Sequence, residues 1–109
     1  MHEEEDLADS IQRYLDHLSQ KRMLSANTVE GYRRDLHLLT EYCAQNQLNC
    51  HTQIQPHHIR VLIAERHRKG SKSKTLQRLL ASVRGLFGFL IQQGQTQHNP
   101  AHGIRPPKG

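Results

Sequence analysis

Apolar residues recur with the period of an α-helix in four separate stretches of this chain. The most regular stretch is 71–93, where seven apolar residues share one helical face: Leu76, Leu79, Leu80, Val83, Leu86, Phe87 and Leu90. Three further helices are expected over about 6–21, about 28–46, and from near Pro56 to just before Gly70. Because no stretch alternates as a strand does, the pattern predicts an all-α fold, a compact four-helix bundle.

Polar residues and glycines mark the ends of these expected helices. Asn27 is expected to cap the second helix, with Glu30 in the position of a capping-box acid. Ser73 is expected to cap the fourth helix. Gly70 and Gly94 are expected to end the third and fourth helices, because glycine readily adopts the left-handed conformation that closes a helix.

The end of the chain is rich in helix-breaking residues. Asn99-Pro100 and Pro106-Pro107 prevent a long helix, so we expect a packed turn followed by an extended, proline-containing tail. The chain accordingly divides into an acidic lead-in (1–5), a helical domain (6–98) and the start of a linker (99–109).

The side of the fourth helix opposite its apolar face is slim, basic and free of acids. It carries long basic side chains first and small residues later: Lys74, Arg78, Ala81, Ser82 and Gly85. Such a face suits close approach to a polyanion such as DNA, and a solvated face of a basic protein is the alternative. Phe89 also falls roughly on this outer side, where we expect it either to pack under the tail or to face a partner.

The charge of the chain is unevenly distributed. The net charge is +5, yet residues 1–16 contribute −5 and residues 17–109 contribute +10. A body this basic attracts nucleic acid or acidic surfaces. No apolar run is long enough to span a membrane, and the acidic start is unlike a signal peptide, so we expect a cytoplasmic protein without a membrane partner.

The cysteines and histidines do not form a recognisable metal motif. Cys43 falls on the apolar face of the second helix and is expected to be a buried thiol. Together with Cys50 and His51 it has no standard zinc spacing, and no glycine-rich phosphate loop is present. We therefore expect no metal and no cofactor.

Several short segments, in a fixed order, resemble the N-terminal core-binding domain of tyrosine recombinases, and the Xer branch fits best. The resemblance covers about residues 7–108 and rests on residues 24–28, 32–36, 68–70, 75–84, 99–101 and 107–108. It implies a SAM-like four-helix domain that binds double-stranded DNA, with its second and fourth helices near the major groove.

The same resemblance implies that the chemistry resides in a larger C-terminal domain. There a tyrosine attacks a backbone phosphate, assisted by an Arg, a Lys and a His-x-x-Arg pair. We recognise none of this set here, and the spacing of His57 and Arg60 is interpreted as chance. The chain is therefore expected to be a fragment that binds DNA and cuts nothing. Its full-length parent would be a recombinase that acts with a second Xer-type subunit, for example in chromosome dimer resolution.

Twelve residues are candidates for contacting DNA, at the start of the second helix, along the fourth helix and on the tail: Asn27, Thr28, Arg33, Arg34, Ser71, Lys72, Ser73, Lys74, Thr75, Arg78, Arg84 and Lys108. Lysines and the hydroxyls at a helix N-terminus suit phosphates, whereas Arg78 suits a base edge. Lys108, together with Arg105, is expected to follow the DNA backbone toward the next domain.

Structural roles remain open for the same residues. The lysines can be solvated charges, and the Ser and Thr side chains can serve only as caps. Arg34 can pair with Glu30 one turn earlier. Arg84, at the edge of the apolar face, can bind either DNA or a carboxylate on the core rim. At the level of the whole chain, the alternatives are a phage-type integrase domain of the same superfamily and a helical protein-interaction module.

Overall fold

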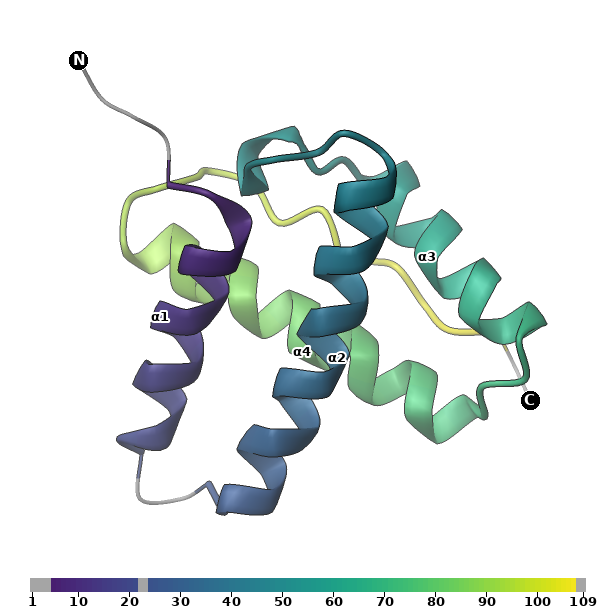
Figure 1. The fold of residues 1–109 in the computed structure, drawn as a ribbon, viewed down its shortest axis with the longest axis horizontal. Coiled ribbons are helices and arrows are strands. Elements are labelled where there is room, and N and C mark those ends of the chain that lie inside the picture. Colours follow the sequence, from purple (N-terminus) through teal and green to yellow (C-terminus); the bar gives the residue numbers. More distant parts are fainter. Residues whose placement is uncertain (1–4, 22–23, 108–109) are drawn as a thin grey trace. The chain divides into compact units, whose positions relative to one another are not determined.

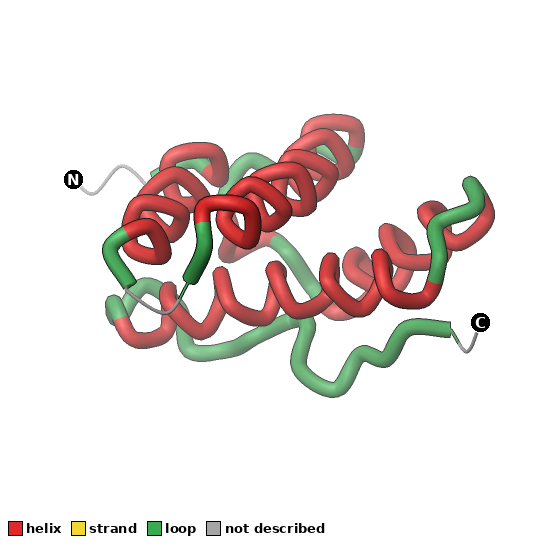
Figure 2. Tube along the Cα trace, turned by 90° about the horizontal axis from the view of Figure 1, so that it is seen from below, coloured by secondary structure: helices red, strands yellow, loops and turns green. Residues whose placement is uncertain are grey.

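The computed structural model describes residues 5–21 and 24–107. These residues form four α-helices, α1 (Leu7–Ser19), α2 (Ala26–Gln45), α3 (Pro56–Arg68) and α4 (Ser73–Gln92), with a short 3₁₀ turn, η1 (His51–Gln53), before α3 (Figure 1). Within the described ranges only helices and loops occur, which confirms the predicted all-α class (Figure 2). The described residues group into two compact units, one that ends at Gln53 and one that begins at Ile54.

The first unit is built on the packing of α1 against α2. Each helix buries one apolar stripe, and the buried apolar residues of the two helices are Leu7, Ile11, Tyr14, Leu15, Leu18, Val29, Leu36, Leu39, Tyr42 and Cys43. Cys43 is 1% exposed and not disulfide-bonded, as predicted, and burial raises the pKa of its thiol to about 12. It is therefore a neutral, unreactive thiol at physiological pH.

The N-terminus of α2 differs from the prediction. Ser25, rather than Asn27, is the cap: its backbone is extended, and its Oγ accepts the N–H of Thr28 at 3.1 Å. Ser25 and Asn27 are both suitable caps, and the helix starts after the earlier one, so it is two residues longer at this end than predicted. Asn27 thus lies in the first turn, and Glu30 pairs with Arg33 instead of closing a capping box.

The second unit contains α3 and α4, which pack on each other. The apolar face predicted for α4 is confirmed, since its seven residues are all buried. However, Ser82 and Phe89, predicted on the outer side, are also buried, at 0% and 8% exposure. The Ser82 hydroxyl donates to the Arg78 carbonyl at 3.0 Å, which satisfies it inside the protein. The buried arc of α4 is therefore wider than one apolar stripe.

The ends of α4 are only partly as predicted. Lys72 occupies the N-cap position and Ser73 is the first helical residue, so the predicted Ser73 cap is wrong. Gly70 and Gly94 have φ of +98° and +73°, which confirms them as the residues that follow α3 and α4 in the left-handed conformation.

After α4 the chain turns back along the helix as a segment without regular secondary structure, residues 95–107, which is called the strap below (Figure 2). Pro100 and Ala101 lie in a turn and are buried, and Ile104 is buried at 7% exposure. The start of the segment expected to be a linker is therefore packed into the second unit.

Candidate nucleic-acid interface

The N-terminus of α4 is the end of a helix that lacks a capping side chain and an acid in its first turn. It contrasts with α1 and α2, which are capped by the side chains of Asp6 and Ser25. The first N–H groups of α4 thus have no side-chain acceptor, and the partial positive charge of the helix end is not offset. This arrangement favours binding of an anion.

A hollow of about 440 Å³ lies beside this helix end, lined by residues from α3, the α3–α4 turn, α4 and the strap: His67, Gly70, Ser71, Lys72, Ser73, Leu76 and Pro107. Three of the predicted DNA-contacting residues therefore come together here. His67 and Pro107 join them, and sequence analysis did not identify either one. The short turn after Arg68 is the signal that could have placed the end of α3 at the start of α4.

The basic side chains of the α4 N-terminal half point to solvent. Lys72, Lys74, Thr75 and Arg78 are exposed, and Lys74 and Arg78 share one face because they are four residues apart. Ser73 is half-buried, and its Oγ lies 3.5 Å from Gln77 Nε2. No acid lies in this first turn, so the exposed charge around it is positive.

The candidates at the start of α2 lie in the first unit and are also exposed, except for Thr28. The Thr28 hydroxyl is 3.0 Å from that of Ser25, so it takes part in the helix cap. Arg33 forms an ion pair with Glu30, with its Nε 3.1 Å from Oε1. The alternative expected for Arg34, a pair with Glu30, is therefore taken by its neighbour. Arg34 has no hydrogen-bond or ion-pair partner within residues 5–21 and 24–107.

Arg84 and Lys108 are the two candidates that remain. Arg84, expected at DNA or at a carboxylate, donates instead from Nε to the Ala101 carbonyl at 3.3 Å and from Nη2 to the Ile104 carbonyl. Lys108 lies outside the described residues, while Arg105, its neighbour on the strap, is exposed.

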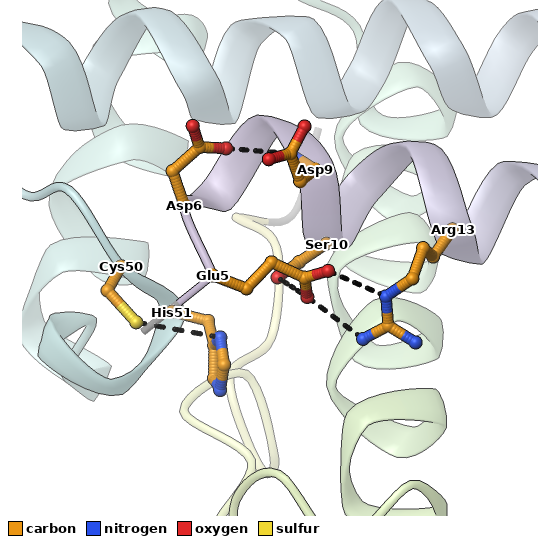
Figure 3. A network of polar contacts seen from close by, with 7 residues as sticks. All are labelled: Glu5, Asp6, Asp9, Ser10, Arg13, Cys50 and His51. Carbon is orange, nitrogen blue, oxygen red and sulfur yellow. Dashed lines mark hydrogen bonds and ion pairs between the residues drawn. The ribbon is translucent and has the colours of Figure 1, made fainter. Parts of the chain in front are cut away.

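A polar network ties the acidic lead-in to α1 (Figure 3). The Glu5 carboxylate accepts hydrogen bonds from Arg13 and from the Ser10 hydroxyl, and these contacts, Arg13 above all, hold the pKa of Glu5 below its usual value. Cys50 and His51 lie nearby, and the Cys50 Sγ is 3.8 Å from His51 Nδ1. Part of the negative charge of the N-terminus is thus neutralised within the first unit.

The described residues contain no group of three or more His, Cys, Asp or Glu side chains arranged to hold a metal ion. None of the described helices combines the length and apolarity needed to cross a membrane.

Comparison with known families gives a match over most of the chain. Residues 11–94 match the family described as phage integrase, N-terminal SAM-like domain, and the chain belongs to this family. This confirms the core-binding-domain resemblance seen in the sequence.

Within that family, the curated relatives are tyrosine recombinases. The chain is 41% identical over 103 residues to tyrosine recombinase XerC of Stutzerimonas stutzeri (strain A1501), a match that covers 94% of this chain and 34% of the relative. It is 40% identical over 99 residues to tyrosine recombinase XerC of Pseudomonas putida (strain W619), a match that covers 91% of this chain and 33% of the relative. The chain thus spans about a third of the length of these relatives. No solved structure gives a significant match.

Proposed function

We propose that this chain is the DNA-binding domain of a Xer-type site-specific tyrosine recombinase and that it grips duplex DNA through α2 and α4. The observation that carries the proposal is the uncapped, acid-free N-terminus of α4, which bears exposed Lys72 and Lys74, in a chain of the phage integrase N-terminal family. Backbone N–H groups at such a helix end, together with the two ammonium groups, suit a phosphate of the DNA backbone.

Each helix has a distinct role in this proposal. At the start of α4, Lys72 and Lys74 bind phosphates, as do the hydroxyls of Ser71, Ser73 and Thr75. Arg78, one turn after Lys74 on the same face, reaches a base edge. On α2, Arg34 is the principal cation, because Arg33 is held by Glu30. Asn27 is exposed in the first turn of α2 and supplies a polar contact.

The full-length protein then cuts and rejoins DNA with catalytic residues outside this chain. The similarity to XerC supports a parent that acts in the cytoplasm on chromosome dimers, together with a XerD-like second subunit. A phage-type integrase is the other member of the same class. The protein-interaction alternative loses its main support, because Phe89, the aromatic side chain expected to face a partner, is buried.

The experiment that tests the proposal is a titration of the chain against a duplex that carries a recombinase half-site and against a scrambled duplex, at several salt concentrations. We expect tighter binding to the half-site, with affinity falling steeply as salt increases. The Lys72→Ala/Lys74→Ala variant should weaken binding to both duplexes and lower the salt dependence by about two phosphate contacts. Arg60→Ala, which removes an exposed arginine of α3, is the matched control and should bind as the parent does. Equal, weak binding of the parent chain to both duplexes would refute a sequence-reading domain.

A further inference from the structure

The side chains of Arg84 and Asn99 connect the middle of α4 to the strap in both directions. Asn99 Nδ2 donates to the Arg84 carbonyl at 3.1 Å, and Asn99 Oδ1 accepts the N–H of Ala101 at 3.1 Å. Arg84 in turn donates to the carbonyls of Ala101 and Ile104. One helical residue thus takes part in three hydrogen bonds to a segment that is 15 to 20 positions away in the sequence.

These bonds determine the course of the strap. After Gly94 the chain reverses, passes Arg84 at Ala101 and Ile104, and comes to Pro107, which lines the hollow at the α4 N-terminus together with Leu76 (Figure 1). From Arg84 back to Leu76, α4 covers about 12 Å. The extended step from Ile104 to Pro107 covers about 10 Å, which is close to the length of α4 between Arg84 and Leu76, so the strap can run beside the helix over this distance.

Burial at Ala101 and Ile104 leaves little room for another course, since both side chains sit in the unit at 0% and 7% exposure. A strap held only by these two apolar contacts could still pivot about them. The guanidinium of Arg84, which reaches two carbonyls three residues apart, removes that freedom because its planar fork presents donors in a fixed geometry.

We propose that Arg84 and Asn99 are positioning residues: they hold the strap against α4, so that its described end, Pro107, lies at the N-terminal end of α4. The consequence for DNA rests on the proposed function: Pro107 is held at the same helix end that binds the phosphates. Arg84 acts on the direction of the chain and does not itself contact DNA.

The test uses the 109-residue chain without DNA. Arg84→Met keeps a long side chain but removes the donors, Asn99→Ala removes the reciprocal bonds, and Arg60→Met is the matched control. Amide hydrogen exchange is measured at Ala101, His102 and Ile104, whose N–H groups bond to Asn99 Oδ1, the Asn99 carbonyl and the Ala101 carbonyl. We expect exchange at these amides to accelerate roughly tenfold in Arg84→Met and in Asn99→Ala, and to be unchanged in the control.

A second measurement separates direction from local stability. Nitroxide labels at Gln92→Cys, on the far end of α4, and at Pro107→Cys report where the end of the strap lies along α4, with Cys43 and Cys50 changed to alanine. The distance distribution should be narrow in this labelled parent and in the control, and clearly broader in Arg84→Met and Asn99→Ala. A purely structural loss of stability would lower the melting temperature while leaving this distribution narrow.

The proposal is overturned if Arg84→Met and Asn99→Ala both fold and both keep the amide exchange rates and the label-to-label distance distribution of the parent. It is also overturned if Arg84→Met loses affinity for half-site DNA while the strap remains in place, because Arg84 would then be a DNA contact. If Arg84→Met does not fold, Asn99→Ala decides by the same two measurements. Since both are made without DNA, their outcome stands independently of the proposed DNA-binding function.

Discussion

Glu5 holds Arg13 through two hydrogen bonds, with Nε 2.8 Å from Oε2 and Nη2 2.9 Å from Oε1. The pair joins the acidic lead-in to α1, eight positions further along the chain. It involves two half-buried side chains, so water screens it only in part. The first described residue of the chain is therefore part of the folded first unit and not a separate acidic tail.

Removing the Glu5 charge should destabilise the chain modestly. Glu5→Gln is expected to lower the free energy of unfolding by about 1 kcal/mol at pH 7, the upper range for a partly exposed pair with two-point geometry. The pKa of Glu5 is depressed in the folded state, so this stabilisation is fully present above its unfolded pKa and is lost as pH falls below about 4.5. Urea unfolding at pH 7 and at pH 3.5 measures both effects. In an Arg13→Met background, Glu5→Gln should have almost no further effect; an undiminished effect there would show that the ion pair is not the cause.

The cap of α2 gives a direct comparison of two neighbouring residues. Ser25→Ala should cost about 1 kcal/mol of stability, because the N–H of Thr28 loses its acceptor. Asn27→Ala should be close to neutral, since Asn27 is exposed in the first turn and alanine favours a helix. Thermal and urea unfolding of the two variants decide between them. The reverse order would restore Asn27 as the cap.

The free energy of unfolding should fall as the pH is lowered below neutrality, and His58 should account for part of this pH dependence. Its Nδ1 accepts the N–H of Gln55 at 2.9 Å at the start of α3, which requires an unprotonated ring nitrogen. Burial, with His57 beside it, lowers the pKa of His58. A folded pKa below the unfolded one means that the stabilisation is present above about pH 6.5 and is lost as pH falls through the folded pKa.

Replacing His58 should flatten this dependence. His58→Asn is expected to reduce the difference in unfolding free energy between pH 7.5 and pH 5.5, measured by urea unfolding. His102→Asn, at an exposed histidine of the strap, is the control and should leave the difference unchanged. If both variants keep the parental pH dependence, the titration of another group is responsible for it.

Local signals in the sequence were enough to predict the four helices, since apolar period and glycine position act over a few residues. The predictions at Gly70 and Gly94 are confirmed for this reason. Asn27 and Ser73 were wrongly predicted as caps, because Ser25 and Lys72 one or two positions earlier take that place. At α2, propensity does not distinguish two neighbouring residues that are both suitable caps. At α4 the helix begins one residue earlier, after a lysine whose side chain does not cap it.

What depends on distant contacts could not be predicted from the sequence. Phe89 is buried because α4 is covered on more than its apolar stripe, which only tertiary packing decides. Arg84 bonds to carbonyls of the strap, and a backbone carbonyl leaves no trace in side-chain patterns. The candidate site follows the same division: the basic start of α4 was visible, whereas the approach of Pro107 to it was not.

The charges at the start of α2 yield the last prediction. Glu30 holds Arg33 and adds a negative charge beside Arg34 on the surface proposed to face DNA. Glu30→Gln should therefore strengthen half-site binding, by about threefold at low salt, because it frees Arg33 and removes repulsion from phosphate. Arg34→Ala should weaken binding and lower the salt dependence by about one phosphate contact, whereas Arg33→Ala should have a smaller effect.

Titrations of these three variants at two or more salt concentrations measure the order, with Arg60→Ala as the control for loss of an exposed arginine. In an Arg33→Ala background, Glu30→Gln should retain only the part of its gain that comes from removing repulsion. If Glu30→Gln and Arg34→Ala both bind as the parent does, then α2 does not contact the duplex, and the DNA-binding surface is confined to the unit that contains α4.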